Sequence, residues 1–224
     1  MPDLDVQHVA KTYPTATDPL VVLRDVSFGL SIGENVAILG PSGCGKSTLL
    51  HILGALDKPT SGTVTLKSQN PFALSEKELA HFRNREIGFV FQDHYLLPQL
   101  TVIENLLLPL LAFSSVTDAS RERAKMLLDR VGLAARAGHL PSELSGGERG
   151  RAAIARALIA KPSLILADEP TGNLDRTTAR SISQLLLDMQ RDEGAMLITV
   201  THSLDLAALM QRRVELDSGA LKNA

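Results

Sequence analysis

The apolar residues of this chain gather in short, nearly uninterrupted runs that are separated by polar and glycine-rich segments. Runs of this length predict buried β-strands rather than helices, and each of them leads into polar or glycine residues. Ligands of an open parallel sheet bind beyond the carboxyl ends of its strands, so these residues are candidates for one shared site. The four runs are residues 35–39, 87–91, 164–167 and 196–201.

Between these runs, helical periodicity and capping signals predict helices. Ser75 and Glu78 have the spacing of a capping box, which favours a helix over 75–83. The segment before about residue 33 predicts short strands and turns, with a turn-rich insertion over 14–19. A further strand is expected over 62–66, and further helices are expected from residue 47, over 118–130 and over 148–159. A later helix is expected because one apolar face is marked by Ile182, Leu185, Leu186 and Met189.

Composition narrows the class of protein. With 224 residues, of which 44% are hydrophobic, the chain can bury a full core as one domain that carries an inserted subdomain. A formal net charge of −2 without a block of basic residues argues against nucleic acid as the main partner. The longest apolar stretch, 106–113, is interrupted by Pro109 and is too short to span a bilayer. No basic-then-apolar segment opens the chain, so we expect no secretory leader.

Residues 40–47 match the pattern G-x-x-x-x-G-K-[ST], after a predicted strand and before a predicted helix. The glycines permit a tight turn that aims backbone N–H groups at phosphate oxygens, and the helix N-terminus adds positive potential. We expect Lys46 to reach the β- and γ-phosphates of ATP and Ser47 to hold Mg²⁺. An ordinary glycine-rich turn with a surface lysine is disfavoured by the flanking elements. The residues expected to contact nucleotide in this phosphate loop are Gly40, Pro41, Ser42, Gly43, Cys44, Gly45, Lys46, Ser47 and Thr48.

The phosphate loop contains the only cysteine, Cys44, which excludes an internal disulfide. A tolerated small residue is the favoured interpretation of this thiol, ahead of a redox switch. We expect a bulky thiol reagent at Cys44 to block nucleotide binding.

Three further strand ends carry chemistry. Asp168 and Glu169 follow the run 164–167 in the Walker B arrangement, in which the first carboxylate holds the Mg²⁺ shell and the second orients or deprotonates the attacking water. Alone, a solvated acidic pair would be the better interpretation; beside a phosphate loop it is not. Gln92 and His202 follow the two other runs, and their shared placement favours site roles over structural ones.

Together these motifs resemble the nucleotide-binding subunits of ATP-binding cassette (ABC) systems, over nearly the whole chain. Residues 144–148 match the family's signature, usually written LSGGQ, Gln92 matches its Q-loop, 173–175 its D-loop and His202 its switch histidine. The resemblance implies catalytic roles for Glu169, His202 and Gln92, and Mg²⁺ binding by Ser47, Gln92 and Asp168. It also implies that Tyr13 stacks on adenine, although a half-buried packing residue remains the alternative.

The implied fold class is α/β, a P-loop NTPase domain of the ABC type. It has a RecA-like core, an N-terminal antiparallel β subdomain and an inserted α-helical subdomain. The resemblance places the core and the β subdomain in residues 1–91 and 156–224, and the helical subdomain with the signature in about 92–155. The whole chain, 1–224, is expected to be a single ABC ATPase domain.

The signature residues directly precede an alanine-rich helical stretch, and a helix N-terminus binds anions. The resemblance implies that this end faces the γ-phosphate held by a second copy, in a head-to-tail homodimer that sandwiches ATP. The signature residues expected to contact nucleotide are Ser145, Gly146, Gly147 and Glu148.

Glu148 stands where glutamine is more usual, and Gly150 replaces another usual glutamine. A glycine inside a helix costs about 1 kcal/mol relative to alanine, and this one is expected to alter hydrolysis or coupling.

Finer resemblance, over residues 96–110, 141–149 and 167–175, is to the bacterial group of lipoprotein-releasing, macrolide-exporter and cell-division ATPases. The lipoprotein-releasing type is the most similar, on residues 47–54, on Leu56 and Asp57 and on residues 141–149. This resemblance implies integral membrane permease partners and a peripheral place on the cytoplasmic face of the inner membrane. The alternatives are an efflux-pump ATPase, a module that regulates envelope hydrolases, and a soluble ABC ATPase acting on DNA or ribosomes. The apolar stretch 93–111 is either core or a groove for a permease helix, and the sequence leaves both open.

Overall fold

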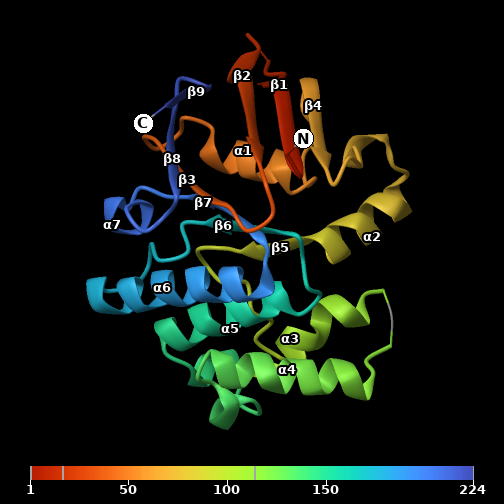
Figure 1. Cartoon of the computed structure of the whole chain (residues 1–224), viewed down its shortest axis with the longest axis vertical. Coiled ribbons are helices and arrows are strands. Elements are labelled where there is room, and N and C mark those ends of the chain that lie inside the picture. The colour runs from red at the N-terminus through yellow and green to blue at the C-terminus, as the bar shows by residue number, and fades with distance from the viewer. Residues whose placement is uncertain (1, 17, 114, 224) are drawn as a thin grey trace.

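The computed structural model describes residues 2–16, 18–113 and 115–223, and these residues form one mixed sheet that is flanked by helices (Figure 1). The strands are β1 (Leu4–Tyr13), β2 (Leu20–Leu30), β3 (Asn35–Leu39), β4 (Ser61–Leu66), β5 (Ile87–Val90), β6 (Leu164–Asp168), β7 (Met196–Val200), β8 (Arg212–Asp217) and β9 (Ala220–Asn223). The α-helices are α1 (Lys46–Leu53), α2 (Glu76–Glu86), α3 (Val102–Leu111), α4 (Asp118–Arg130), α5 (Gly146–Leu158), α6 (Arg176–Glu193) and α7 (Leu204–Ala207). None of the helices in the described ranges is long and apolar enough to cross a membrane.

The sheet has the order β4-β1-β2-β9-β8-β3-β7-β6-β5 among the described residues. The neighbours from β8 through β3, β7 and β6 to β5 run parallel, which confirms the expected parallel sheet and its four apolar runs. At the other end, β1 pairs with β2 and β4 in antiparallel fashion. The carboxyl ends of β3, β5, β6 and β7 therefore lie at one edge of the sheet, as the sequence predicted.

The expectation of short strands before residue 33 was wrong. β1 has 10 residues and β2 has 11, and the two pair from Leu4 opposite Leu30 to Tyr13 opposite Leu20. Three shifts of register interrupt this pairing, and such bulges break the alternation of apolar and polar positions by which a long strand is recognised. The turn-rich insertion joins the two strands, although Thr17 within it lies outside the described residues.

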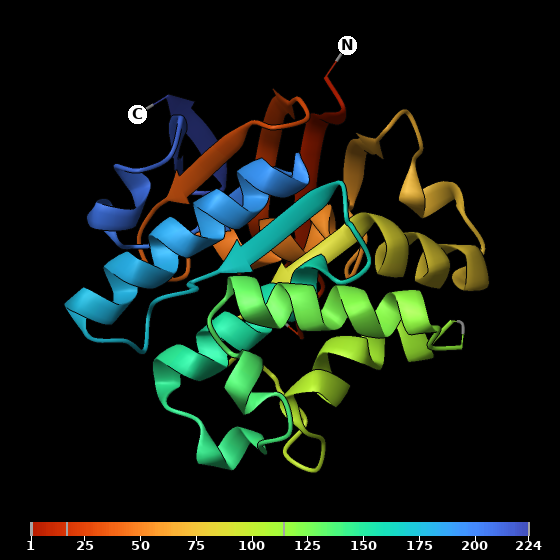
Figure 2. The same cartoon turned by 60° about the horizontal axis from the view of Figure 1, so that its bottom comes forward.

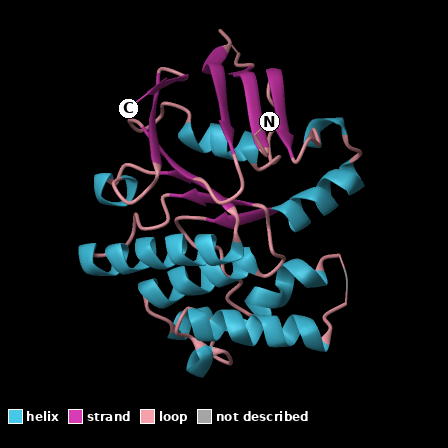
Figure 3. Cartoon of the chain, viewed as in Figure 1, coloured by secondary structure: helices cyan, strands magenta, loops and turns pink. Residues whose placement is uncertain are grey.

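Two apolar cores cover the two faces of the parallel strands. Figures 2 and 3 show the strands and the helices that flank them from different directions. In β6, Leu164 and Leu166 pack with α1 and the strands β1 and β2, whereas Ile165 and Ala167 pack with α3 to α6. Alternate residues of one strand thus enter opposite cores, because successive side chains of a strand point to opposite faces. Full burial on both faces explains why these strands appear in the sequence as continuous apolar runs.

Local capping fixes the helix ends. Ser75 and Glu78 form the expected capping box at the start of α2, which extends to Glu86, three residues beyond the expected end. The helix α4 has the bounds that the amphipathic pattern predicted. In α6 the expected apolar face is buried at Ile182, Leu186 and Met189, while Leu185 is partly buried.

Candidate nucleotide-binding site

The phosphate loop lies between β3 and α1, and its glycines adopt backbone conformations that other residues avoid. Gly40 has φ 154°, and a Cβ atom there would come 2.3 Å from the carbonyl oxygen of Leu216. Gly45, in the left-handed conformation with φ 104°, is the N-cap of α1, and a Cβ there would lie 3.0 Å from the carbonyl oxygen of Val22. Glycine is needed at both positions, because only glycine allows the loop to wrap its backbone N–H groups around a phosphate in this conformation.

Lys46 and Ser47 start the helix α1 and point to different parts of the site. The Lys46 Nζ atom donates to the carbonyl oxygens of Gly40 and Pro41, at 2.8 and 2.9 Å, so the ammonium lies over the phosphate loop. The Ser47 Oγ atom lies 3.5 Å from the Asp168 Oδ1 atom at the end of β6. The structure therefore brings Ser47 and Asp168 together, although 121 positions separate them in the sequence, and places Lys46 beside Ser47 at the start of α1.

Asp168 is an acid whose charged form is disfavoured by its place. Burial raises the pKa of the Asp168 carboxyl above its usual range, the neighbouring Glu169 charge raises it further, and the Ser47 hydroxyl partly opposes the shift. A desolvated carboxylate beside a hydroxyl is a set of hard oxygen donors, which is what Mg²⁺ prefers. The residues present fit a divalent cation bound together with a triphosphate.

Glu169 and His202 meet directly. The His202 Nδ1 atom lies 2.9 Å from Glu169 Oε1, while the Thr201 hydroxyl and the His202 backbone N–H donate to Glu169 Oε2 at 3.0 and 3.2 Å. The Glu169 side chain is only 15% exposed, whereas that of His202 is 72% exposed. Glu169 also has φ 44°, a strained value for a residue other than glycine, of the kind that gathers at functional sites. The carboxylate is thus held in one orientation by three donors.

Gln92 follows β5 at the same edge of the sheet but is not brought to Ser47 and Asp168. Its side-chain nitrogen donates to Asn173 Oδ1 at 3.2 Å, and the Asn173 amide in turn donates to Asp93 at 3.3 Å. The segment that resembles a Q-loop is therefore linked to the segment that resembles a D-loop. The roles of Gln92 in catalysis and in Mg²⁺ binding stay predictions.

The signature residues form the beginning of α5. Ser145 is the N-cap, its hydroxyl accepts from the Glu148 N–H at 3.3 Å, and the Glu148 carboxylate accepts from the Ser145 N–H at 2.8 Å. This capping box gives Glu148 a structural role that a sequence comparison with LSGGQ does not show. Gly146 and Gly147 form the first turn of α5. This helix lies on the face of the sheet opposite α1 (Figure 1), so one chain does not bring its signature to its phosphate loop.

Tyr13, at the end of β1, lies beside α1. Its hydroxyl donates to Asp57 Oδ2 at 2.6 Å. This hydrogen bond, followed by burial and the charge of Asp57, raises the pKa of the Tyr13 hydroxyl, and a hydrogen bond with Thr48 partly opposes the shift. Tyr13 is half-buried, as both interpretations of the sequence required.

Sequence reasoning missed several residues that hold the site together. Asp57 and Lys11 contact Tyr13 from other elements, and Thr201 orients Glu169. Asp57 was noted only as part of the finer family resemblance and was given no role. Thr201 could have been found because it is a polar residue at the end of a buried run. Lys11 could have been suspected because it stands two residues after Val9, where the alternation along β1 predicts a buried position.

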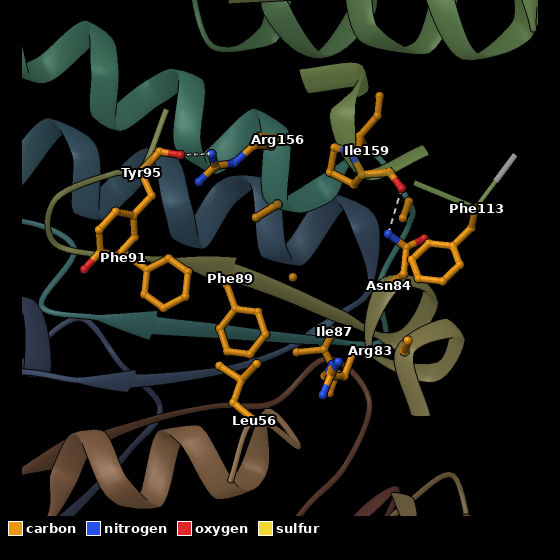
Figure 4. Close-up of a pocket in the computed structure, with 15 residues that line it drawn as sticks. Leu56, Arg83, Asn84, Ile87, Phe89, Phe91, Tyr95, Phe113, Arg156 and Ile159 are labelled. Atoms are coloured by element: carbon orange, nitrogen blue, oxygen red, sulfur yellow. Dashed lines mark hydrogen bonds between the residues drawn. The ribbon is translucent and has the colours of Figure 1, made fainter. Parts of the chain in front are cut away.

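A cavity of about 410 Å³ lies along β5, the last strand in the sheet order of the described residues, and is lined by Leu56 after α1, by Arg83 of α2 and by Arg156 of α5 (Figure 4). The rings of Phe89, Phe91 and Tyr95 follow one another along it, with centroids 5.2 and 5.1 Å apart. Tyr95 is 62% exposed, and Arg156 of α5 donates to the Tyr95 carbonyl oxygen. We call this cavity the aromatic groove. Of the stretch 93–111, Tyr95 lines the aromatic groove, whereas Leu96 packs against the core. Core packing is thus confirmed for part of the stretch, and a role as a groove for a permease helix stays a prediction.

Comparisons with known proteins agree with this geometry. The sequence pattern of the ABC transporter family matches residues 23–172. The lipoprotein-releasing system ATP-binding protein LolD 1 of Rhodopirellula baltica is 58% identical over 218 residues, which cover 97% of this chain and 95% of that protein. The protein LolD of Bordetella pertussis is 47% identical over 221 residues, which cover 99% and 96%.

A solved structure of the ATP-binding cassette MJ0796, a dimeric post-hydrolysis state bound to ADP and Pi, matches with a TM-score of 0.88, 39% identity and 98% coverage of both chains. The expected P-loop fold of the ABC type is thereby confirmed. Because the family pattern covers most of the chain and the relatives match along nearly their whole length, the chain belongs to the ABC transporter family, as one of its ATP-binding ATPase subunits.

Proposed function

We propose that the chain hydrolyses ATP to drive the release of lipoproteins from an inner membrane, as the peripheral cytoplasmic subunit of a membrane-embedded complex. Relatives that are 47% and 58% identical are named as ATP-binding proteins of lipoprotein-releasing systems. The observation that carries the chemistry is the 2.9 Å contact between Glu169 and His202, next to the Ser47–Asp168 pair. Cargo selection belongs to the membrane partner in this proposal.

In the proposed mechanism, Glu169 is the general base. Its carboxylate accepts a proton from the water that attacks the γ-phosphorus, while Thr201 and His202 keep both oxygens oriented. Lys46 moves from the carbonyl groups of the loop to the β- and γ-phosphates, where its charge is better placed. Burial of Glu169 keeps bulk water from competing for its oxygens, so only a positioned water is activated.

Mg²⁺ is the proposed cofactor, and Ser47 Oγ with the Asp168 carboxylate would hold it. When bound, the cation neutralises the charge that develops on the phosphate oxygens. Burial of the Asp168 carboxylate away from water is the main cause of its raised pKa, and a bound cation would offset this cost of holding the charge. Gln92 is proposed to exchange its hydrogen bond with Asn173 for a contact near the cation.

A homodimer is proposed as the active form. Ser145, Gly146, Gly147 and the N–H groups at the start of α5 would meet the γ-phosphate held by the phosphate loop of the second copy. The support is that α1 and α5 cover opposite faces of the sheet, together with the dimeric state named for the similar MJ0796 structure. Stronger ATP binding by the closed dimer than by the open one would then shift the population to the closed state.

The aromatic groove is proposed to receive a helical segment of the permease partner. It is lined by exposed Tyr95, Leu56 and Phe113 (Figure 4). Phe91 also lines it, and Gln92 follows Phe91 directly in the sequence. A partner segment that presses on Tyr95 would therefore act within three residues of the proposed nucleotide-sensing glutamine.

The decisive experiment uses detergent-solubilised membranes and the Glu169→Gln variant. We expect this variant to lose about 10²- to 10⁴-fold in turnover, because the base is lost, and to keep ATP binding. With ATP it should retain a multi-span membrane protein and lipoproteins, identified by mass spectrometry. Recovery of soluble proteins only would contradict the release function.

A second variant tests whether lipoprotein release depends on ATP hydrolysis by this chain. Lys46→Ala in the purified membrane complex should abolish both hydrolysis and lipoprotein release, because its ammonium is needed at the phosphates. Lys77→Ala removes an exposed lysine of α2 and serves as the matched control. Unchanged release by Lys46→Ala would contradict the proposal.

A further inference from the structure

The ring of Tyr13 is held by two charged residues, Asp57 and Lys11, to which the sequence assigned no role. Its hydroxyl donates to Asp57 Oδ2 at 2.6 Å, and the Lys11 Nζ atom lies over the ring, 4.6 Å from its centroid. Resting on the proposed function, we propose that Asp57 and Lys11 are positioning residues that fix the Tyr13 ring as a one-sided platform for the adenine base of ATP.

Lys11 covers one face of the ring and has little freedom to leave it. The residue is only 9% exposed, and its ammonium donates to Asp57 Oδ1 at 2.6 Å and to the Lys58 carbonyl oxygen at 2.7 Å. A buried ammonium with two oxygen partners remains in place, since leaving them would cost more than their individual hydrogen bonds. Adenine can then stack only on the opposite face of Tyr13, and the cation–π contact fixes which face that is.

Asp57 connects this platform to the helix that begins with the phosphate loop. Its backbone N–H donates to the His51 carbonyl oxygen at 3.3 Å, and the N–H of Leu56 donates to the same oxygen at 2.8 Å. Asp57 is therefore anchored to the last turns of α1, whose first residue is Lys46. The distance between the base platform and the phosphate loop is set through one short, rigid helix.

The carboxylate of Asp57 is suited to this bridging role. Burial alone would raise the pKa of the Asp57 carboxyl, but hydrogen bonds from Lys11 and Tyr13 outweigh burial and hold the pKa below its usual value. Both oxygens are used, one by the ammonium and one by the phenol. The ring is consequently restrained at its hydroxyl end and on one face, while Tyr13 itself remains half-exposed.

The experiment compares two ligands that differ in the base. Binding of Mg-ATP and of Mg-tripolyphosphate, which has phosphates but no base, is measured for the full chain and for Asp57→Ala. We expect about tenfold weaker ATP binding in the variant, since stacking on an aromatic ring is worth roughly one such factor, and an unchanged affinity for tripolyphosphate. Turnover at saturating ATP should stay the same, so KM rises while kcat does not.

Two further variants keep the inference falsifiable. Tyr13→Phe removes a single oxygen and keeps the ring, so it should weaken ATP binding alone, by a smaller factor, even where Asp57→Ala fails to fold. Adding Tyr13→Phe to Asp57→Ala should weaken ATP binding no further, because the hydroxyl restrains the ring through Asp57. Glu122→Ala, which removes an exposed ion pair on α4, is the matched control and should leave both affinities unchanged.

The outcomes separate this inference from the proposed function. Equal loss of ATP and tripolyphosphate binding in Asp57→Ala would overturn the platform, because Asp57 would then support the phosphate loop itself. Additive losses in the double variant would overturn it as well. If the unmodified chain bound neither ligand, the proposed ATPase function would fail, and this inference with it.

Discussion

At the scale of single residues, the buried Asp168 carboxylate lowers the stability of the folded chain and is suited to the proposed cation. Its pKa is raised in the folded chain, chiefly by burial, so the folded state holds a proton more tightly than the unfolded state does. For an acid of this kind, stability falls as pH rises through the unfolded-state value, about 3.9, toward the raised folded value, and the penalty is fully present above the folded value. The charge is tolerated because a cation is expected beside it.

We therefore expect Asp168→Asn to raise the melting temperature of the chain without Mg²⁺ or nucleotide at pH 7, and to weaken Mg-ATP binding about tenfold. Thermal unfolding and calorimetric titration check the two effects. The gain in melting temperature should shrink as the pH is lowered below the folded pKa, because Asp168 then becomes neutral in the unmodified chain. Asp188→Asn, on the exposed side of α6, is the control. A lower melting temperature for Asp168→Asn would contradict this account.

His202 offers the opposite case, a residue that matters for chemistry and little for stability. Its side chain is 72% exposed, and exposed ion pairs contribute little to folding. We expect His202→Ala to lower kcat by about two orders of magnitude, since Glu169 loses one of its orienting partners, with no measurable change in melting temperature. Steady-state hydrolysis and a thermal melt are sufficient, and a kcat within about twofold of the unmodified chain would exclude a role for the histidine.

At the scale of elements, the space beside Gly150 of α5 is bordered by the ring of His94. A Cβ atom at position 150 would lie 3.6 Å from His94 Cε1 and 3.7 Å from Ile182 Cδ1, which is ordinary contact. His94 is 7% exposed and has φ 62°, and Arg156 donates to its carbonyl oxygen at 2.6 Å. A methyl group therefore fits beside the His94 imidazole, whereas a glutamine side chain would extend beyond the Cβ atom toward this buried ring.

Gly150→Ala should therefore stabilise the chain by about 1 kcal/mol, which raises the melting temperature by roughly 2–4 °C for a chain of this size. Gly150→Gln, the residue usual in relatives, should destabilise it instead, because His94 has to leave its site. The double variant Gly150→Gln with His94→Ala should recover most of the lost stability. If Gly150→Gln proved as stable as Gly150→Ala, the packing argument would be wrong.

How far the sequence predicts these elements depends on how local their causes are. The bounds of α4 and the capping box of α2 follow from residues within one or two turns, and both were predicted. The lengths of β1 and β2 depend on pairing with a distant partner and on bulges, and they were underestimated. In the same way, the phosphate loop is a local pattern, whereas the Asp57 and Thr201 contacts arise only when separate strands and helices meet.

At the scale of the whole molecule, the sheet separates the two anion-binding helix ends. The N-terminus of α1 belongs to the core that contains β1 and β2, and α5 belongs to the core on the other face. A single chain can therefore supply half of each proposed composite site, and a head-to-tail pair supplies two complete sites. This geometry predicts that two different inactive variants can complement each other.

The complementation test mixes Lys46→Ala with Ser145→Asp. Aspartate is a good N-cap, so the second variant keeps the start of α5 but repels the phosphate of the partner copy, whereas Ser145→Asn keeps the cap without the charge and is its control. In a mixed dimer both changes fall in the same composite site, which leaves the other site intact. With random pairing of equal amounts, half of the dimers are mixed and each has one working site, so about a quarter of the unmodified activity should return. No recovery, with each variant folded and dimerising, would mean that each chain hydrolyses ATP with its own signature or that both sites must fire together.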